Sequence, residues 1–228
     1  MKKRIGDLKI NGQSSSAGGR YNSVIINGEG KIVGDLDCIK LKISGRCDIN
    51  GNVKAKSVEV YGSNSITGNL EAERAKIHGT ADINGNLSVN KEAEIYGSID
   101  VDGDCNAEIF NIAGIFAIEG LLNAGKLKLS LYGSSRAREI GGEKITVKRK
   151  GKYDLLGLKD KIMSLSGQSK ELTADIIEGD DVYLENTQTK VVRGNNIEIG
   201  PGCEIEIVEY KDSFKQDEKA EVETHEKI

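Results

Sequence analysis

Two glycines recur at a fixed distance in residues 45–85, which read GRCDINGNVKAKSVEVYGSNSITGNLEAERAKIHGTADING. Beyond this stretch the first series runs Gly28, Gly45, Gly62, Gly79, Gly97, Gly114, Gly133, and the second runs Gly34, Gly51, Gly68, Gly85, Gly103, Gly120. A 17-residue gap is the commonest in both series. Each series also contains one gap of 18, which places a single inserted residue between Gly85 and Gly97, and the last gap of the first series is 19. Such a period is the signature of a solenoid of stacked coils.

Alternate residues between the glycines are mostly aliphatic, so that each coil has three short strands with two inward side chains each. In one coil these pairs are Val53/Ala55, Val58/Val60 and Asn64/Ile66. Alternation directs every second side chain of a strand to the same face. The sequence therefore predicts an all-β fold, a triangular parallel β-helix with 17-residue coils, whose regular part covers residues 24–147. Asn64 is the one clear polar residue at an inward position.

Composition narrows the functional classes. The net charge of −4 argues against general binding of nucleic acid, which favours a basic chain. Four cysteines form no CxxC pair, and no phosphate-binding GxxxxGK[ST] loop is present, so we expect buried free thiols and no cofactor or metal. The chain starts MKKRIGDLKI without the apolar core of a signal peptide, and no apolar run reaches the ~20 residues that span a bilayer, which predicts a cytoplasmic protein.

The coils resemble those of bactofilins, the polymer-forming cytoskeletal proteins of bacteria. The likeness rests on VIINGEGKIVGDLDCIK (residues 24–40), EGLLNAG (119–125), REIGGE (138–143) and VVRGNNIEIGPGCEIEIVEY (191–210), and the later segments are similar to the longer bactofilins of Gram-positive bacteria. The resemblance implies a right-handed β-helix and a non-enzymatic scaffold that assembles end to end into filaments without nucleotide. It also implies a place at the inner surface of the membrane. The expected partners are copies of the chain itself, the membrane surface, or proteins of the cell envelope or motility apparatus, with no small-molecule substrate.

The rest of the chain divides into segments around the regular helix. Residues 1–23 read as an N-terminal edge coil interrupted by a flexible loop, QSSSAGGRYN. Residues 148–171 form a basic and amphipathic insert, in which Leu155, Leu158, Ile162 and Leu165 have the spacing of one face of a short helix. Residues 172–210 are a further β segment that continues the solenoid or lies along it. Residues 211–228 are polar and predict a disordered tail.

Two sets of residues are candidates for contact surfaces. The open ends of a solenoid invite pairing with another chain, and the predicted polymer interface is formed by Leu8, Ile10, Val24, Ile26, Ile205, Ile207 and Tyr210. Outward positions that elsewhere are polar hold Ala113, Ile115, Ala117 and Leu121. Exposed apolar patches are usually covered, so we expect the helix of the insert to fold over Ile115 and Leu121.

Two alternatives remain open at this point. The basic stretch at residues 134–152 has seven Lys or Arg against two Glu, which fits either attraction to anionic lipid or nucleic acid, or a solvated strand edge. The second alternative is a left-handed β-helix acyltransferase, because IEIGPGCEIEI (residues 197–207) is similar to a hexapeptide repeat. Its one candidate base is His78, which the period places between Tyr61 and Tyr96 in an exterior ladder.

Overall fold

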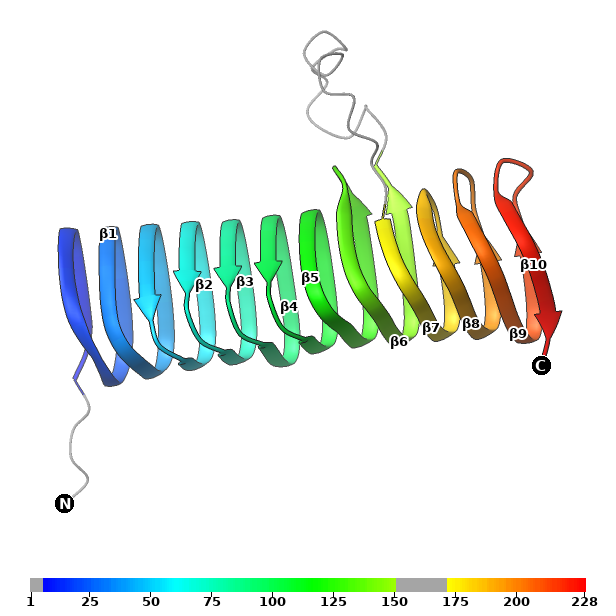
Figure 1. Ribbon diagram of the computed structural model, residues 1–228. Coiled ribbons are helices and arrows are strands. Elements are labelled where there is room, and N and C mark those ends of the chain that lie inside the picture. The colour runs from blue at the N-terminus through cyan, green and yellow to red at the C-terminus, as the bar shows by residue number, and fades with distance from the viewer. Residues whose placement is uncertain (1–5, 151–171) are drawn as a thin grey trace, which may run out of the picture.

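The computed structural model describes residues 6–150 and 172–228, which form a rod of stacked coils with Leu8 and Ile228 near opposite ends (Figure 1). One parallel sheet contains all ten strand elements in sequence order. They are β1 (Leu8–Asn50), β2 (Val53–Ile66), β3 (Leu70–Ile83), β4 (Leu87–Val101), β5 (Cys105–Leu131), β6 (Ser135–Arg149), β7 (Leu172–Leu184), β8 (Thr187–Ile199), β9 (Glu204–Gln216) and β10 (Glu221–Lys227). The predicted all-β solenoid is confirmed, and none of the described residues is helical. Its handedness stays a prediction.

The pairing register confirms the 17-residue coil. Leu36 pairs with Val53, Val53 with Leu70, and Leu70 with Leu87, so each partner lies one such coil further along the chain. The inserted residue predicted between Gly85 and Gly97 forms a bulge in β4, where the register shifts between Val89 and Glu92. The ladder resumes beyond the bulge.

Side chains along each element alternate between buried and exposed positions. In β2 the buried positions are the three predicted pairs, Val53/Ala55, Val58/Val60 and Asn64/Ile66. Each fully buried aliphatic side chain contributes about 1.5–3 kcal/mol, so the columns together hold the coils in register. The first-series corner requires glycine because Gly79 has a φ of 138° and a Cβ there would lie 1.9 Å from the Gly62 carbonyl oxygen.

A ladder of Asn and Asp side chains closes the second corner. The Oδ1 of Asp35, Asn52, Asn69, Asn86 and Asp104 each accepts a hydrogen bond, 2.7–2.9 Å long, from a backbone N–H one coil further along. These bonds satisfy amides that the turn takes out of the sheet ladder. The final donor is Leu121, where the polar column ends.

The two ends of the chain differ from expectation. Residues 13–22 belong to strand β1 instead of a flexible loop, and Arg20 pairs with Asp37 at 2.8 Å. Residues 211–216 and 221–227 belong to β9 and β10 instead of a disordered tail. Both predictions gave too much weight to polar composition; main-chain pairing with a preformed neighbouring strand overcomes it, since an outer coil needs few inward apolar side chains.

The later coils continue the solenoid, which answers the question left open for residues 172–210. The coil becomes shorter there, because Leu172 pairs with Thr187 and Thr173 with Gln188. Ser135 pairs with Leu172, so the coils that precede and follow the insert in sequence stack directly on one another. The helix predicted from Leu155 to Leu165 lies outside the described residues.

Candidate assembly surfaces

The first coil forms the N-terminal end of the rod. Ile10 is buried and Leu8 packs against the core, and the Asn22 N–H bonds to the Gly6 carbonyl at 2.9 Å. The second side of this coil, residues 13–17, has no aliphatic residue larger than alanine. The N-terminal end is thus apolar on one side of the triangle and polar on the next.

Three aromatic rings lie together at the C-terminal end of the rod. Tyr210 and Phe214 stack with their centroids 5.5 Å apart, and His225 lies 4.9 Å from Phe214 and 6.4 Å from Tyr210. His225 pairs with Val208 and Val208 with Val192, both fully buried, so His225 occupies an inward column at the point where the core opens to solvent. We call Tyr210, Phe214 and His225 the C-terminal aromatic cluster. Stacked rings form a cohesive apolar surface with polar edges, which suits an interface.

The structure brings together only some of the residues predicted for the polymer interface. Leu8, Ile10 and Tyr210 belong to the ends of the rod. Val24 and Ile26 are fully buried beneath the first coil, so they cannot reach another chain.

Two residues predicted for the C-terminal end also lie away from the end surface. Ile205 is covered by Val222 of β10, whereas Ile207 is 37% exposed on the side of the rod. The end positions expected for Val24, Ile26 and Ile205 are corrected, because strands read as loop and tail cover the coils that had been taken as terminal. Ile207 lies on the side of the rod, and the polymer interface itself stays a prediction.

Sequence reasoning missed Phe214, Val222 and His225. All three lie in the stretch that was read as a tail. The signal was present, since Glu221 pairs with Glu204 and Val222 with Ile205, at the same 17-residue spacing that defines the earlier coils. The 17-residue period predicts a strand at these positions, whereas their polar composition predicts a tail.

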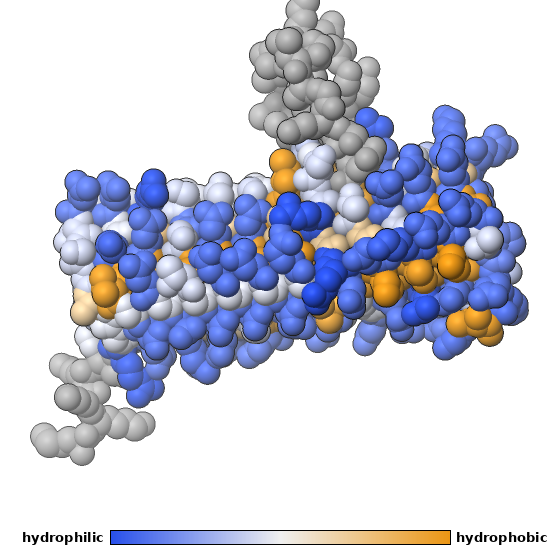
Figure 2. Space-filling view, in the orientation of Figure 1, coloured by the Kyte–Doolittle hydropathy of each residue, from blue (hydrophilic) through white to orange (hydrophobic). Residues whose placement is uncertain are grey.

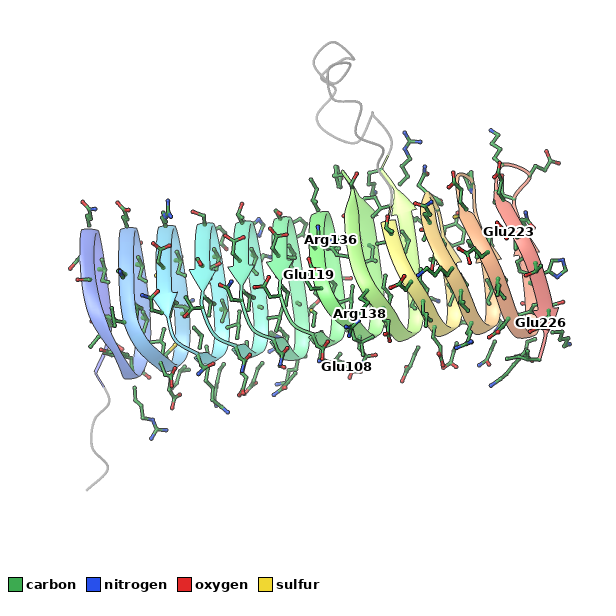
Figure 3. The ribbon with its side chains drawn as sticks, viewed as in Figure 1. Glu108, Glu119, Arg136, Arg138, Glu223 and Glu226 are labelled. Atoms are coloured by element: carbon green, nitrogen blue, oxygen red, sulfur yellow. The ribbon has the colours of Figure 1, made fainter. Side chains whose placement is uncertain are left out.

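The predicted apolar patch is divided. Ile115 is 39% exposed and Leu121 is half-buried, on the same strand β5. Glu119 lies between them and forms an ion pair with Arg136 of β6 (Figure 3). The segment expected to cover the patch lies outside the described residues, so its docking there stays a prediction.

The described part of the basic stretch fits a solvated strand edge. Residues 135–149 are strand β6, Arg136 is paired with Glu119, and Lys148 lies over the Tyr183 ring at 5.3 Å from its centroid. Glu119 neutralises Arg136, and Glu139 lies 3.8 Å from Arg138, whereas Lys148 keeps its charge beside the ring. These contacts give part of the stretch a structural role, and its attraction to anionic lipid or nucleic acid stays a prediction.

His78 and the cysteines, the candidate reactive side chains that the sequence offered, have the following surroundings. His78 is stacked between Tyr61 and Tyr96, at centroid distances of 5.2 and 4.8 Å, on the exterior of the rod. Burial raises the thiol pKa of Cys38 to about 11 and that of Cys47 to about 12, each with a smaller contribution from an adjacent aspartate.

The other two thiols behave in the same way. Burial also raises the pKa of Cys105, and it raises that of Cys203 to about 11. Protonated buried thiols are poor nucleophiles. Among the described residues, no group of three or more His, Cys, Asp or Glu side chains is arranged to hold a metal ion.

Nothing in residues 6–150 and 172–228 forms a helix long and apolar enough to span a bilayer.

Comparison with known proteins agrees with the architecture. A family model described as "Bactofilin: Polymer-forming cytoskeletal" matches residues 3–88 and 47–123. The chain is 53% identical to the uncharacterized protein YhbE of Bacillus subtilis (strain 168), over 97% of this chain and 98% of that protein. It is 41% identical to the uncharacterized protein YhbF of the same strain, over 47% of this chain and 42% of that protein. No solved structure matches. The acyltransferase alternative finds no support in these matches, and the chain belongs to the bactofilin family of polymer-forming cytoskeletal proteins.

Proposed function

We propose that this protein is a non-enzymatic cytoskeletal scaffold whose rods join end to end into filaments without nucleotide. The family is polymer-forming, and the two ends of the rod are surfaces through which copies could join. A parallel β-helix leaves unpaired N–H and C=O groups along its first and last coils, and these groups can pair with another chain.

The C-terminal aromatic cluster carries the proposal. Val222 and the rings of Tyr210 and Phe214 are only partly buried by their own chain. Phe214 pairs with Ile197, and β10 pairs with residues 204–210 of β9, before Phe214 is reached. Contact with a second copy would bury this partly exposed apolar surface and satisfy the strand edges together.

Substitution at the cluster tests the interface. Phe214→Arg is expected to give short soluble species instead of filaments, because a guanidinium would be desolvated at the contact. The matched control is Tyr96→Arg, which places the same charge at an aromatic position that is 49% exposed in the middle of the rod. Negative-stain microscopy and sedimentation measure the outcome, and circular dichroism shows that both variants fold. Filaments of unchanged length from Phe214→Arg would exclude this end.

The finer part of the proposal places the filaments at the inner membrane surface. Lys2, Lys3 and Arg4 at the start of the chain supply positive charge of the kind that anionic lipids attract, about 1 kcal/mol for each residue near the surface. Co-sedimentation with vesicles containing phosphatidylglycerol should fall when all three are replaced by glutamine. Equal binding to purely zwitterionic vesicles would argue against this location, and it would leave the filament proposal intact.

A further inference from the structure

A groove runs along one side of the C-terminal half of the rod. Glycines occupy the column that forms its floor. In successive coils, Ala124 is followed there by Gly142, Gly179 and Gly194. The glycines are required by the close stacking of the backbone in this column, since a Cβ at Gly179 would lie 2.5 Å from the Gly142 carbonyl oxygen. The result is a groove of about 710 Å³ that extends from β5 to the C-terminus of the chain.

The groove is acidic. Five carboxylates line it, Glu108, Glu139, Glu143, Glu178 and Asp180, against the two cations Arg193 and Lys211. Arg193 is already engaged in an ion pair with Glu209. An occupant that enters this groove must therefore supply positive charge, because like charges within a few ångströms destabilise a contact.

An apolar strip borders the groove. Ile176, Val191 and Ile207 pair directly on β7, β8 and β9 and point outward, and Ile176 also lines the groove. Figure 2 shows hydrophobic side chains gathered among hydrophilic ones over this half of the rod. Thr224 is the β10 partner of Ile207. Glu223 lies one residue before Thr224 and Glu226 two residues after it (Figure 3). The strip is thus a continuous apolar surface, bordered by the ion pairs Lys190–Asp175 and Arg193–Glu209 and by the further carboxylates Glu223 and Glu226.

We infer that the groove and the apolar strip form a docking site for residues 152–170 of this chain. That segment holds Leu155, Leu158, Ile162 and Leu165 at the spacing of one helical face, with four lysines against two aspartates. Its chemistry, an apolar stripe with a positive balance, complements the strip and the carboxylates around it. The segment also ends in the right place, since the chain re-enters the fold at Leu172, shortly before Ile176 on the same strand.

Two other assignments are weaker. In a symmetric contact, a second copy would bind through the same face, so its carboxylates would lie against those of the first copy. This repulsion disfavours a symmetric contact between copies. The patch of Ile115 and Leu121 is divided by the Glu119–Arg136 ion pair, which an apolar helix would have to desolvate. In the strip, the Lys190–Asp175 and Arg193–Glu209 pairs lie beside the apolar members and not between them.

A tryptophan reporter tests the site in the full chain, which contains no other tryptophan. Leu158→Trp is expected to emit at the short wavelength of a buried indole. Adding Ile176→Thr and Ile207→Thr should shift the emission to that of solvent-exposed tryptophan and raise iodide quenching severalfold, because the apolar contact is lost. Adding Val33→Thr instead, at a position 55% exposed on β1, should change neither quantity. Circular dichroism and the melting temperature show that each variant folds.

Three outcomes would overturn the inference. One is solvent-like emission from Leu158→Trp alone, since the segment would then be undocked. Another is a shift produced by Ile115→Thr and not by the strip variants, which would place the segment on the divided patch. The third is equal quenching in the strip and control variants. Failure here would leave the filament proposal unaffected, because the groove lies on the side of the rod.

Discussion

Replacing Asn64 by leucine should stabilise the solenoid. Asn64 is 3% exposed, and its Oδ1 is the one buried side-chain oxygen or nitrogen in the described residues without a hydrogen-bond partner. It stands in an inward column between Cys47 and Ala81, both fully buried. A buried acceptor without a partner costs about 1–3 kcal/mol. Leucine branches at Cγ as asparagine does and removes that cost; it is the larger side chain, and its neighbours in the column, Cys47 and Ala81, are small.

The expected gain is therefore about 1–3 kcal/mol in the free energy of unfolding. In a chain of this size each kcal/mol raises the melting temperature by roughly 2–4 °C. Urea denaturation followed by circular dichroism measures the gain, in the Phe214→Arg background so that assembly does not contribute. Ser63→Leu, one residue away on the exterior, is the matched control and should change stability by no more than ~0.5 kcal/mol. A lower stability for Asn64→Leu would contradict the expected gain: either the amide has a partner that outweighs its burial, or the larger leucine strains the column.

Further predictions follow from the corners, the charges and the thiols. Gly79→Ala should destabilise by more than about 2 kcal/mol, because it combines a positive φ with a backbone clash, whereas Gly125→Ala, whose nearest contact is 3.0 Å, should cost less; equal melting temperatures would contradict this. Burial, and secondarily Asp100, raises the pKa of Asp82, so the folded state binds its proton more tightly than the unfolded state, and Asp82→Asn should stabilise at neutral pH. That gain should shrink as the pH falls through the raised pKa, and a gain independent of pH in urea titrations would refute the assignment. The four cysteines should react slowly with iodoacetamide at mildly alkaline pH until the protein is unfolded; rapid native labelling measured by mass spectrometry would show that the thiols are accessible.

The regular part of the fold was predictable because its signals are physical and repetitive. A glycine recurs wherever the corner leaves no room for a Cβ, and an aliphatic residue recurs wherever a side chain enters the core. Even the bulge in β4 was visible as one extra residue in both glycine series. Few residue types fit these corner and core positions, so the repeat is visible in the sequence.

The ends were not predictable in the same way. Residues 13–22 and 211–227 are polar, and their strands depend on pairing with the neighbouring coil more than on their own inward side chains. Local composition therefore predicted loop and tail, and the end surface was assigned to Val24, Ile26 and Ile205, one coil too far inside. The Asn and Asp ladder was likewise missed, since each residue looks like an ordinary turn residue until the coils are stacked.

The axial repeat of the assembled filaments tests the central claim most directly. Purified full-length protein, examined by electron microscopy without nucleotide, should form filaments whose repeat reflects the length of the rod. Ten strand elements stacked ~4.8 Å apart, with β1 and β5 spanning more than one coil, give a rod on the order of 50–60 Å. Filaments with this repeat, or twice it if neighbouring rods alternate in direction, would support end-to-end assembly of solenoids. Discrete particles at every protein and salt concentration, or filaments only with added nucleotide, would contradict it.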